Sequence, residues 1–530
     1  MKKYLVLLTF ALTFAARAAV PPAEKLLPND TLFMLSAPDA TKLKSIYETS
    51  PQGQLWNDPA MRPFREDFNK RFSSEYLAPL EKELGISFSD YKDLAQGQIT
   101  LAVIRNGWTG QPDEKLGIVL LVDTKDKSDQ LKTNLAGLKK RWVETGKEIR
   151  TEKLHNFEFT TIVTSDEEIG KSLEKVLPGR EQPAGETNKV EITVGQANSL
   201  LLLGNSPKVI EKILSKLSGG LVPGLAEEPA YENNHNAYFR GAHVYAWANP
   251  KPFLDVWKAA PVEDENPFMP KPDKIISAIG LNGLQSLAFA YTDSAEGGTV
   301  KFLIGAPESS RQGLFKMLIP EAKNAGPLPY IGNDVVKFNR WRLNLQNMFT
   351  ALENMMTDMS PAAAGVFKLV LDSAGKDQDP NFDLRKELFG NLGDDMITIQ
   401  KAPRSSSLDD INAPPTLYLV GSANPEKVAH ALKVALSSLG QDSFKEREFL
   451  GRKVYSLSIA NPALGAPNTP AKSFHFSSSG GYFAGSSDVA MLEQFLRSSE
   501  FSGKPLSETA GLSDAIQKVG GLSTGLFAFE

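Results

Sequence analysis

The chain has 530 residues, 41% of them apolar and 23% charged, which is typical of a globular protein with a sizeable core. It contains no cysteine, which excludes disulfides, thiolate zinc sites, iron–sulfur clusters and cysteine nucleophiles. Its formal net charge is −5 and it has no basic run, which argues against a nucleic-acid partner, because such affinity comes largely from Lys and Arg on phosphates.

The N-terminus has the three parts of an export signal. Lys2 and Lys3 precede a short apolar run over residues 4–15, and Ala16-Arg17-Ala18 is a small-residue cleavage site. We therefore expect a signal peptide over residues 1–18 and a mature protein in the periplasm or outside the cell. Loss of the three basic residues would take the formal charge from −5 to −8. No later apolar stretch reaches the length of a membrane span, so we expect no transmembrane segment after cleavage.

The first elements of the mature chain are a strand over residues 31–35 and a helix capped by Asp39. A second helix follows, in which Phe64, Phe68 and Phe72 recur every four residues. An aromatic stripe at this spacing usually faces a core, and a ligand groove is the rarer use, so the sequence predicts that these rings are buried.

Three motifs in this region suggest a family. They are Leu27-Pro28-Asn29-Asp30-Thr31, then Ala37-Pro38-Asp39, then residues 50–64, which read SPQGQLWNDPAMRPF. Together they resemble the start of a family of exported bacterial proteins of unknown function, found in the planctomycete and verrucomicrobial group and related bacteria. The resemblance is best over residues 27–68 and implies export, but it implies no reaction, cofactor or catalytic residue.

One arrangement of strands and helices occurs twice along the chain. Thr100 matches Thr398 and Val122 matches Val420, both at an offset of 298 residues. Further on, residues 203–206 match 484–487, and Ala246 matches Phe527, both at an offset of 281. An offset that is constant, changes once at a loop and is constant again indicates an internal duplication.

Hairpins dominate the pattern, and helices follow pairs of strands instead of alternating with single strands. The sequence therefore predicts an α+β fold of duplicated units, each a largely antiparallel sheet with helices packed on one face. We expect the first lobe, with an N-terminal helical segment, over residues 19–325, and the second over residues 326–530. The second copy ends where the first continues into a linker, a hairpin and a helix, so we expect either a fragment or a copy that lacks its last hairpin.

The common catalytic and phosphate-binding motifs are missing or incomplete. Gly170-Lys171-Ser172 has the end of a phosphate loop but lacks its first glycine, and no Gly-x-Ser-x-Gly elbow occurs. The histidines have no metal-ligand spacing on a helix and are expected to be structural or solvated; they are His155, His235, His243, His430 and His475.

Two acidic stretches are the other candidates for chemistry. Residues 377–383 alternate oxygen ligands like a calcium loop, but Phe382 replaces the glycine that such a loop needs, so a loop that caps the next helix is the preferred interpretation. Asp394 and Asp395 are expected to form a turn before a strand. The sequence thus nominates no catalytic residue, no cofactor-binding residue and no metal ligand.

Trp108 is the one residue proposed for surface contact. It lies in a polar hairpin loop, and exposed tryptophans favour binding surfaces, although the ring can also fold back over its own hairpin. We expect a non-enzymatic binding or scaffolding module of the bacterial envelope, whose partner is an unknown envelope protein or ligand. The alternatives are an exported hydrolase with a site assembled from distant residues, and a carrier of an apolar ligand.

Overall fold

The computed structural model describes residues 19–111, 114–165, 189–260, 268–294, 297–437, 444–459 and 472–530. Contacts within the chain divide it into two compact units. The first unit is Met1–Val256 with Leu284–Pro307, and the second is Trp257–Gly283 with Glu308–Glu530. The predicted signal peptide and the Gly170-Lys171-Ser172 stretch lie outside the described residues.

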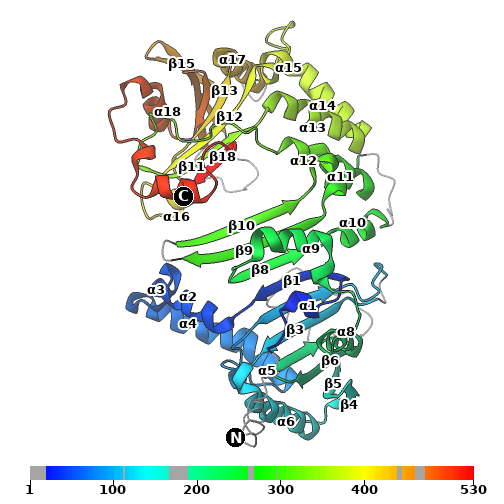
Figure 1. Cartoon of the computed structure of the whole chain (residues 1–530). Coiled ribbons are helices and arrows are strands. Elements are labelled where there is room, and N and C mark those ends of the chain that lie inside the picture. Colours follow the sequence, from blue (N-terminus) through cyan, green and yellow to red (C-terminus); the bar gives the residue numbers. More distant parts are fainter. Residues whose placement is uncertain are drawn as a thin grey trace, which may run out of the picture. The chain divides into compact units, whose positions relative to one another are not determined.

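The described part of the first unit contains a ten-stranded antiparallel sheet. Its strand order is β10-β9-β8-β1-β2-β3-β7-β6-β5-β4 (Figure 1). The strands are β1 (Thr31–Ala37), β2 (Ile99–Ile104), β3 (Gly117–Asp123), β4 (Glu148–Leu154), β5 (Phe157–Ser165), β6 (Lys189–Ala197), β7 (Leu200–Gly204), β8 (Val244–Ala248), β9 (Ser286–Ser294) and β10 (Gly297–Gly305).

The described part of the second unit contains an eight-stranded antiparallel sheet. Its strand order is β14-β15-β16-β17-β13-β12-β11-β18. The strands are β11 (Val335–Arg342), β12 (Leu392–Lys401), β13 (Thr416–Ser422), β14 (Phe444–Phe449), β15 (Arg452–Ile459), β16 (Lys472–Ser479), β17 (Tyr482–Ser486) and β18 (Leu526–Phe529). The predicted α+β class with two antiparallel sheet units is confirmed.

The two sheets have the same order once β1 is matched with β11. Strands β4 to β7 match β14 to β17, and β8 matches β18, while β9 and β10 extend the first sheet alone. Even an irregularity recurs: the pairing shifts after Thr31↔Ile104 in the first sheet and after Val335↔Lys401 in the second. An isolated bridge also recurs, as Pro28↔Gly224 and Gly332↔Pro505.

The pairing corrects both sequence matches by one residue. Gly204 pairs with Val119 and Ser486 pairs with Leu417, so Gly204 matches Ser486; likewise Tyr245, and not Ala246, matches Phe527.

The match of β2 with β12 is also one residue out. Thr100 pairs with Leu121, whereas Thr398 pairs with Tyr418, so both strands cannot be matched at an offset of 298. Thr100 is buried, as is Ile397, while Thr398 lies on the opposite face of its sheet. Ile397 is therefore the structural counterpart of Thr100, because a shift of one residue moves every side chain of a strand to the other face.

Each unit has a helical insertion between its first two strands and further helices that cover the sheet. In the first unit the helices are α1 (Ala23–Leu26), α2 (Ala40–Thr49), α3 (Pro51–Asn57), α4 (Arg62–Phe72), α5 (Ala78–Leu84), α6 (Ser128–Glu144), α8 (Pro207–Leu217) and α9 (Pro229–Asn234), while α10 (Lys251–Lys258) crosses the boundary in sequence. In the second they are α11 (Pro272–Ile279), α12 (Gly313–Met317), α13 (Leu345–Met359), α14 (Pro361–Ser373), α15 (Leu384–Glu387), α16 (Leu408–Asn412), α17 (Pro425–Leu436), α18 (Val489–Leu496) and α19 (Leu512–Lys518).

The boundary differs from the predicted one at residue 325. Helices α11 and α12 contact α13 and so belong to the second unit, although they precede residue 325. The hairpin β9–β10 lies between them in sequence but continues the first sheet. A linear division could not anticipate this, because the chain returns to the first sheet after α11.

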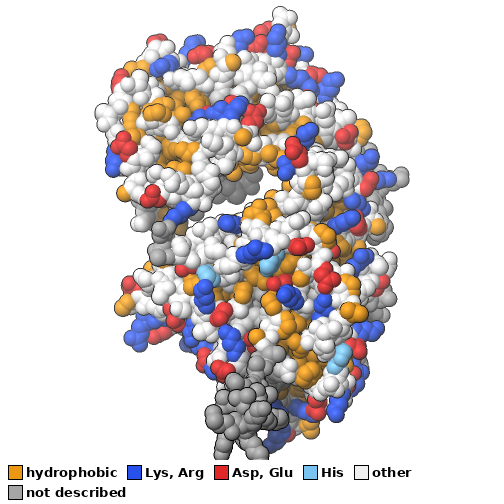
Figure 2. All heavy atoms as spheres, in the orientation of Figure 1, with side chains coloured by type: hydrophobic (Ala, Val, Ile, Leu, Met, Phe, Trp, Pro, Cys, Tyr) orange, Lys and Arg blue, Asp and Glu red, His pale blue; other side chains and the backbone are white. Residues whose placement is uncertain are grey.

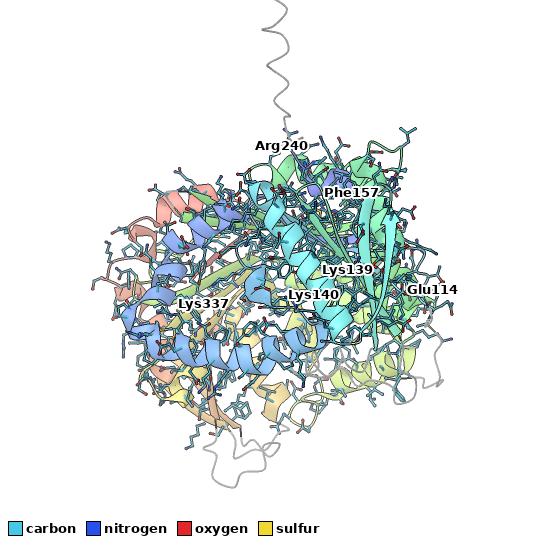
Figure 3. The ribbon with its side chains drawn as sticks, turned by 90° about the horizontal axis from the view of Figure 1, so that it is seen from below. Glu114, Lys139, Lys140, Phe157, Arg240 and Lys337 are labelled. Atoms are coloured by element: carbon cyan, nitrogen blue, oxygen red, sulfur yellow. The ribbon has the colours of Figure 1, made fainter. Side chains whose placement is uncertain are left out.

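Helices pack on both faces of the first sheet, not on one face as predicted. Leu200 and Leu202 of β7 face α8, while Leu201 faces α6 on the other side. The reason is that β7 is apolar at every position, so both of its faces must be covered. Figure 3 shows α6 alongside β5, where Lys139 Nζ of α6 lies 2.8 Å from Glu158 Oε1.

Candidate functional site

The most exposed apolar surface of the first sheet lies on the face opposite α8, beyond the positions that the α6 cluster covers. Over β10, β9, β8, β1, β2 and β3, the face opposite α8 carries apolar side chains in consecutive paired positions. We call this surface the open face. Its exposed members are Leu35, Leu101, Ile118, Leu287, Val300, Phe302 and Ile304.

Register explains why these side chains form one surface. Phe302 pairs with Phe289, which pairs with Ala246 of β8, which pairs with Leu35 of β1. Leu35 in turn pairs with Leu101, so the row continues across the sheet. Phe302 is 78% exposed, and its ring centroid lies 5.1 Å from that of Phe289. Figure 2 shows the first unit from the opposite side, that of α8 and α9, where charged and hydrophobic side chains are interspersed.

At two central positions the second sheet is more polar on the corresponding face, although Met396, Tyr418 and Leu526 are also exposed there. By the pairing, Asn339 stands where the first unit has Leu35, and Thr398 stands where it has Leu101. Strands β1 and β2 of the first sheet thus carry leucines where β11 and β12 of the second sheet carry an amide and a hydroxyl. The fold by itself does not require leucine at these two positions, so those leucines call for another explanation.

The aromatic stripe of α4 is exposed, and the prediction that it faces a core is wrong. Phe64 is 57% exposed, and Phe68 and Phe72 are only slightly less so. The rings stack on one another, and Trp56 of α3 packs edge-on against Phe64 and Phe68. Helical spacing places the rings on one face, but α2, α3 and α4 form an arm whose described contacts are mainly with one another, so no core covers the stripe.

Asp394 and Asp395 lie inside β12 and not in a turn, as the sequence suggested. Asp395 is buried and accepts two hydrogen bonds from Arg340, at 2.9 and 2.7 Å. It also accepts from Arg342 at 2.9 Å and from the Tyr482 hydroxyl at 2.8 Å. Arg340 donates a further bond to the Gly326 carbonyl oxygen at 2.7 Å. The carboxylate is thus surrounded by donors from its own unit, which is the arrangement of a structural ion pair.

The charges of this cluster shift the pKa values around it. Burial raises the pKa of Asp394, but hydrogen bonds and charge from Lys323 and Arg342 outweigh burial and hold it below the usual value. Burial lowers the pKa of Arg340, and Asp395 reverses this, so that it lies above its usual value. Burial together with Asp395 raises the pKa of Tyr482 well above that of free tyrosine. At neutral pH Asp394 and Arg340 are therefore charged and the Tyr482 hydroxyl is neutral, as their hydrogen bonds require.

Trp108, the predicted contact residue, is half-buried and packs against Phe253 of α10, with ring centroids 5.3 Å apart. The backbone of its loop is fixed by Arg105, whose Nε donates to the Trp108 carbonyl oxygen at 2.8 Å. Trp108 thus lies at the surface beside the exposed Phe253.

The other acidic and histidine candidates have structural surroundings. Asp383 caps α15 by accepting from the Lys386 backbone N–H at 3.2 Å, as predicted, and Phe382 is buried in a small core. His475 Nδ1 lies 2.8 Å from Ser456 Oγ, and burial lowers the pKa of this histidine. Within the described ranges, no group of three or more His, Asp and Glu side chains is placed to hold a metal ion.

His235 is helical, in the turn after α9, and not in a loop. Its Nε2 lies 3.5 Å from Glu24 Oε1, and Glu24 also accepts from the Tyr245 hydroxyl at 3.0 Å. Glu24 is a buried residue of α1, so this group is part of the interior of the first unit.

No protein-family model, curated protein or solved structure matches this chain. The structure also has no helix, among the residues it describes, that is long and apolar enough to cross a membrane.

Sequence reasoning did not identify the open face, although a signal for it exists. Strands such as residues 299–304 and 99–104 are apolar at most successive positions instead of alternating, which indicates two apolar faces. The usual conclusion is that both faces are buried. Only the placement of α6, over β5 and β6 and not over β10 and β9, leaves one of them open.

Proposed function

We propose that this protein is a non-enzymatic binding module of the bacterial envelope, which holds an apolar partner on the open face of its first unit. The observation that carries this proposal is the contrast between Leu35 and Leu101 in the first sheet and Asn339 and Thr398 at the matching places in the second. Contiguous exposed apolar surfaces of this kind commonly mark interaction sites, because they cost solubility and bury favourably against a partner.

The matched positions also supply the experiment. The variant Leu35→Asn with Leu101→Thr gives the first unit the residues that the second already tolerates, so it should fold. Native mass spectrometry of the mature protein, purified from its own envelope, should show a bound protein or ligand mass in the natural chain and not in this variant. Leu369→Ser is the control, because Leu369 is 69% exposed on α14 of the second unit and does not belong to the sheet that carries the open face.

A bare monomer in the natural chain would overturn the proposal, as would a bound mass that the double variant retains and Leu369→Ser removes. A photoreactive amino acid at Phe302 provides a second measurement. It should crosslink the partner in intact cells, and the crosslink should disappear in the Leu35→Asn, Leu101→Thr background.

We also propose that the protein is exported after cleavage of residues 1–18. The basic start, the short apolar run and the Ala16-Arg17-Ala18 site support this proposal, as does the resemblance of residues 27–68 to exported proteins. N-terminal sequencing of the protein from a periplasmic fraction should begin at Ala19. Recovery of an intact Met1 from the cytoplasmic fraction would contradict it.

We infer, finally, that the two units descend from one ancestral unit by duplication. The common strand order, the shared irregularity after Thr31 and Val335, and the shared bridge near Gly224 and Pro505 support this inference. Independent convergence on the same minor irregularities is a less economical explanation. A chain elsewhere that carries a single unit with both irregularities would be the expected intermediate.

A further inference from the structure

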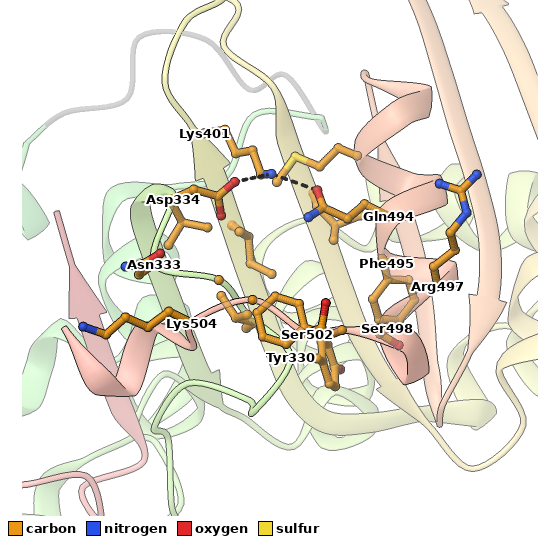
Figure 4. Close-up of a pocket in the computed structure, with 18 of the residues that line it drawn as sticks. Tyr330, Asn333, Asp334, Lys401, Gln494, Phe495, Arg497, Ser498, Ser502 and Lys504 are labelled. Atoms are coloured by element: carbon orange, nitrogen blue, oxygen red, sulfur yellow. Dashed lines mark hydrogen bonds and ion pairs between the residues drawn. The ribbon is translucent and has the colours of Figure 1, made fainter.

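The second unit contains a cavity of about 420 Å³ between the end of its sheet and α18 (Figure 4). Its floor is apolar and buried, formed by Ile331, Val335, Ile399, Leu417 and Phe495. The loop over residues 498–504 closes one side. A volume of this size is at the lower end for small-molecule sites and suits a ligand of about a dozen non-hydrogen atoms.

One end of the cavity is polar and centred on Lys401. Its Nζ lies 2.6 Å from Asp334 Oδ2 and 2.8 Å from Gln494 Oε1, as the dashed lines in Figure 4 show. A lysine ammonium has three protons, so one remains for a ligand after these two bonds. The Gln494 amide nitrogen is a second donor beside it. The charged side chains around the cavity are three cations, Lys401, Arg497 and Lys504, against two carboxylates, Asp334 and Glu500, which favours an anion.

The position of Lys401 is unusual for a lysine. It continues the buried face of β12, two residues beyond the buried Ile399. Its counterpart in the first unit is Ile104, since Thr31 pairs with Ile104 where Val335 pairs with Lys401. Ile104 is fully buried there, so the same position in the first unit is filled by an apolar side chain.

In the first unit, the cation that pairs with the corresponding aspartate lies on a helix and not on the strand. Asp30, the counterpart of Asp334, is paired at 2.9 Å with Lys212 of α8, and Lys212 stands where α18 has Gln494. The backbone in both places is the same: Asn29 N–H donates to the Pro223 carbonyl oxygen, and Asn333 N–H donates to that of Lys504. The lysine that pairs with this aspartate thus comes from the helix in the first unit. In the second unit it comes from the core-facing side of β12, at the edge of the cavity.

We propose that this cavity binds an amphipathic carboxylate, a medium-chain fatty acid of about ten carbons. The alkyl chain would lie against the apolar floor near Phe495 and Ile331, and the carboxylate would accept hydrogen bonds from Lys401 and Gln494. The apolar floor accounts for affinity, since each buried CH₂ contributes roughly 0.8 kcal/mol. The lysine accounts for the preference for an anion over a neutral head group.

The experiment is isothermal titration calorimetry of the full mature chain with decanoate and with decanol. We expect saturable binding of decanoate with one equivalent, and weaker binding of decanol. Lys401→Met keeps the length of the side chain and removes its charge, and it should weaken decanoate at least about tenfold while leaving decanol unchanged. Lys337→Met is the control, because Lys337 lies on the same sheet but pairs with Glu530, and it should change neither affinity.

Gln494→Leu is a second variant, at an exposed helix position, and it should weaken the binding of decanoate alone. The proposal is overturned if the natural chain does not bind decanoate, or if Lys401→Met and Gln494→Leu, shown to be folded by circular dichroism, bind it as the natural chain does. Equal binding of decanoate and decanol by the natural chain would also overturn it, since the ammonium would then play no part. These outcomes do not depend on the open face of the first unit.

Discussion

At the scale of single residues, the ion pair between Asp395 and Arg340 has the largest expected effect on stability. Both side chains are buried, and Asp395 also receives bonds from Arg342 and Tyr482. Replacing two such charges together with apolar groups can be neutral, but removing one leaves the other desolvated without a partner. Each side chain of the pair therefore depends on the other for its burial.

Asp395→Asn should lower the free energy of unfolding by about 3–5 kcal/mol, because it leaves Arg340 and Arg342 without a buried counter-charge. Urea unfolding of the full chain measures this. Glu446→Gln removes a partly exposed partner of Lys433 in the same unit and should cost about 1 kcal/mol or less. A loss of similar size in the two variants would mean that the buried cluster is not needed for stability.

The neighbouring Asp394 predicts a dependence on acid pH. Its folded pKa lies below the usual 3.8, held there by Lys323 and Arg342. A lowered folded pKa means that the ionised form stabilises the fold at all pH values above the unfolded pKa, and that this contribution is lost as the pH falls through the folded pKa. Stability should therefore be constant in this respect above about pH 4 and fall below it.

Asp394→Asn checks the assignment. Because the amide cannot titrate, the variant should be less stable at neutral pH and lose less stability between about pH 4 and pH 2. Thermal unfolding monitored at a series of pH values measures both effects. An identical acid transition in the variant and the natural chain would assign the pH dependence to other carboxylates.

At the scale of elements, the arm of α2, α3 and α4 shows that an amphipathic pattern does not by itself imply a buried helix face. The stripe of Phe64, Phe68 and Phe72 has the spacing of a core-facing helix, as does the buried set on α6, which includes Leu131 and Leu138. The two helices differ in what stands opposite them. Helix α6 lies over the outer strands, and the described contacts of α4 are with its neighbours in the arm.

This difference can be measured by truncating one residue in each helix. Leu138→Ala should cost about 2–5 kcal/mol, the usual range for a buried leucine. Phe68→Ala should cost less than about 1 kcal/mol, because most of the ring is already in contact with water or with other exposed rings. A large loss from Phe68→Ala would indicate that the stripe is buried in solution, against a partner or a second copy.

At the scale of the whole molecule, each sheet has a closed face and a face that its helices leave partly open. Leu101 and Ala102 are neighbours on β2, but Leu101 is 39% exposed and Ala102 is fully buried. The second sheet repeats this with Tyr418 exposed and Leu419 buried on β13. The solvent exposure of the two faces of a sheet can thus be compared at neighbouring residues of one strand.

The absence of natural cysteines makes this comparison direct. A maleimide should label Leu101→Cys and Phe302→Cys rapidly in the folded protein and Ala102→Cys only after unfolding. Addition of the partner proposed above should protect Leu101→Cys and Phe302→Cys. Slow labelling of Phe302→Cys in the purified monomer would contradict an open face.

Much of the architecture could be predicted from the sequence, and the errors have common physical causes. The strands around Thr100 and Val122 were identified from their apolar pattern, while β4 was missed because it is an edge strand rich in charge, with only Leu154 buried. The one-residue error at Thr398 arose because Thr100 and Thr398 both lie among aliphatic residues. Side-chain identity could not show which face each of them points to, whereas the pairing could.

The sequence by itself determined the class of fold, the antiparallel hairpins and the caps such as Asp383, because these depend on neighbours within a few residues. It could not determine that Asp395 is buried, since the two arginines that compensate its charge come from another strand. It could not determine that Leu101 and Phe68 are exposed, or that Lys401 borders a cavity. Pattern says which face of an element a side chain occupies, and only the tertiary structure decides whether anything covers that face.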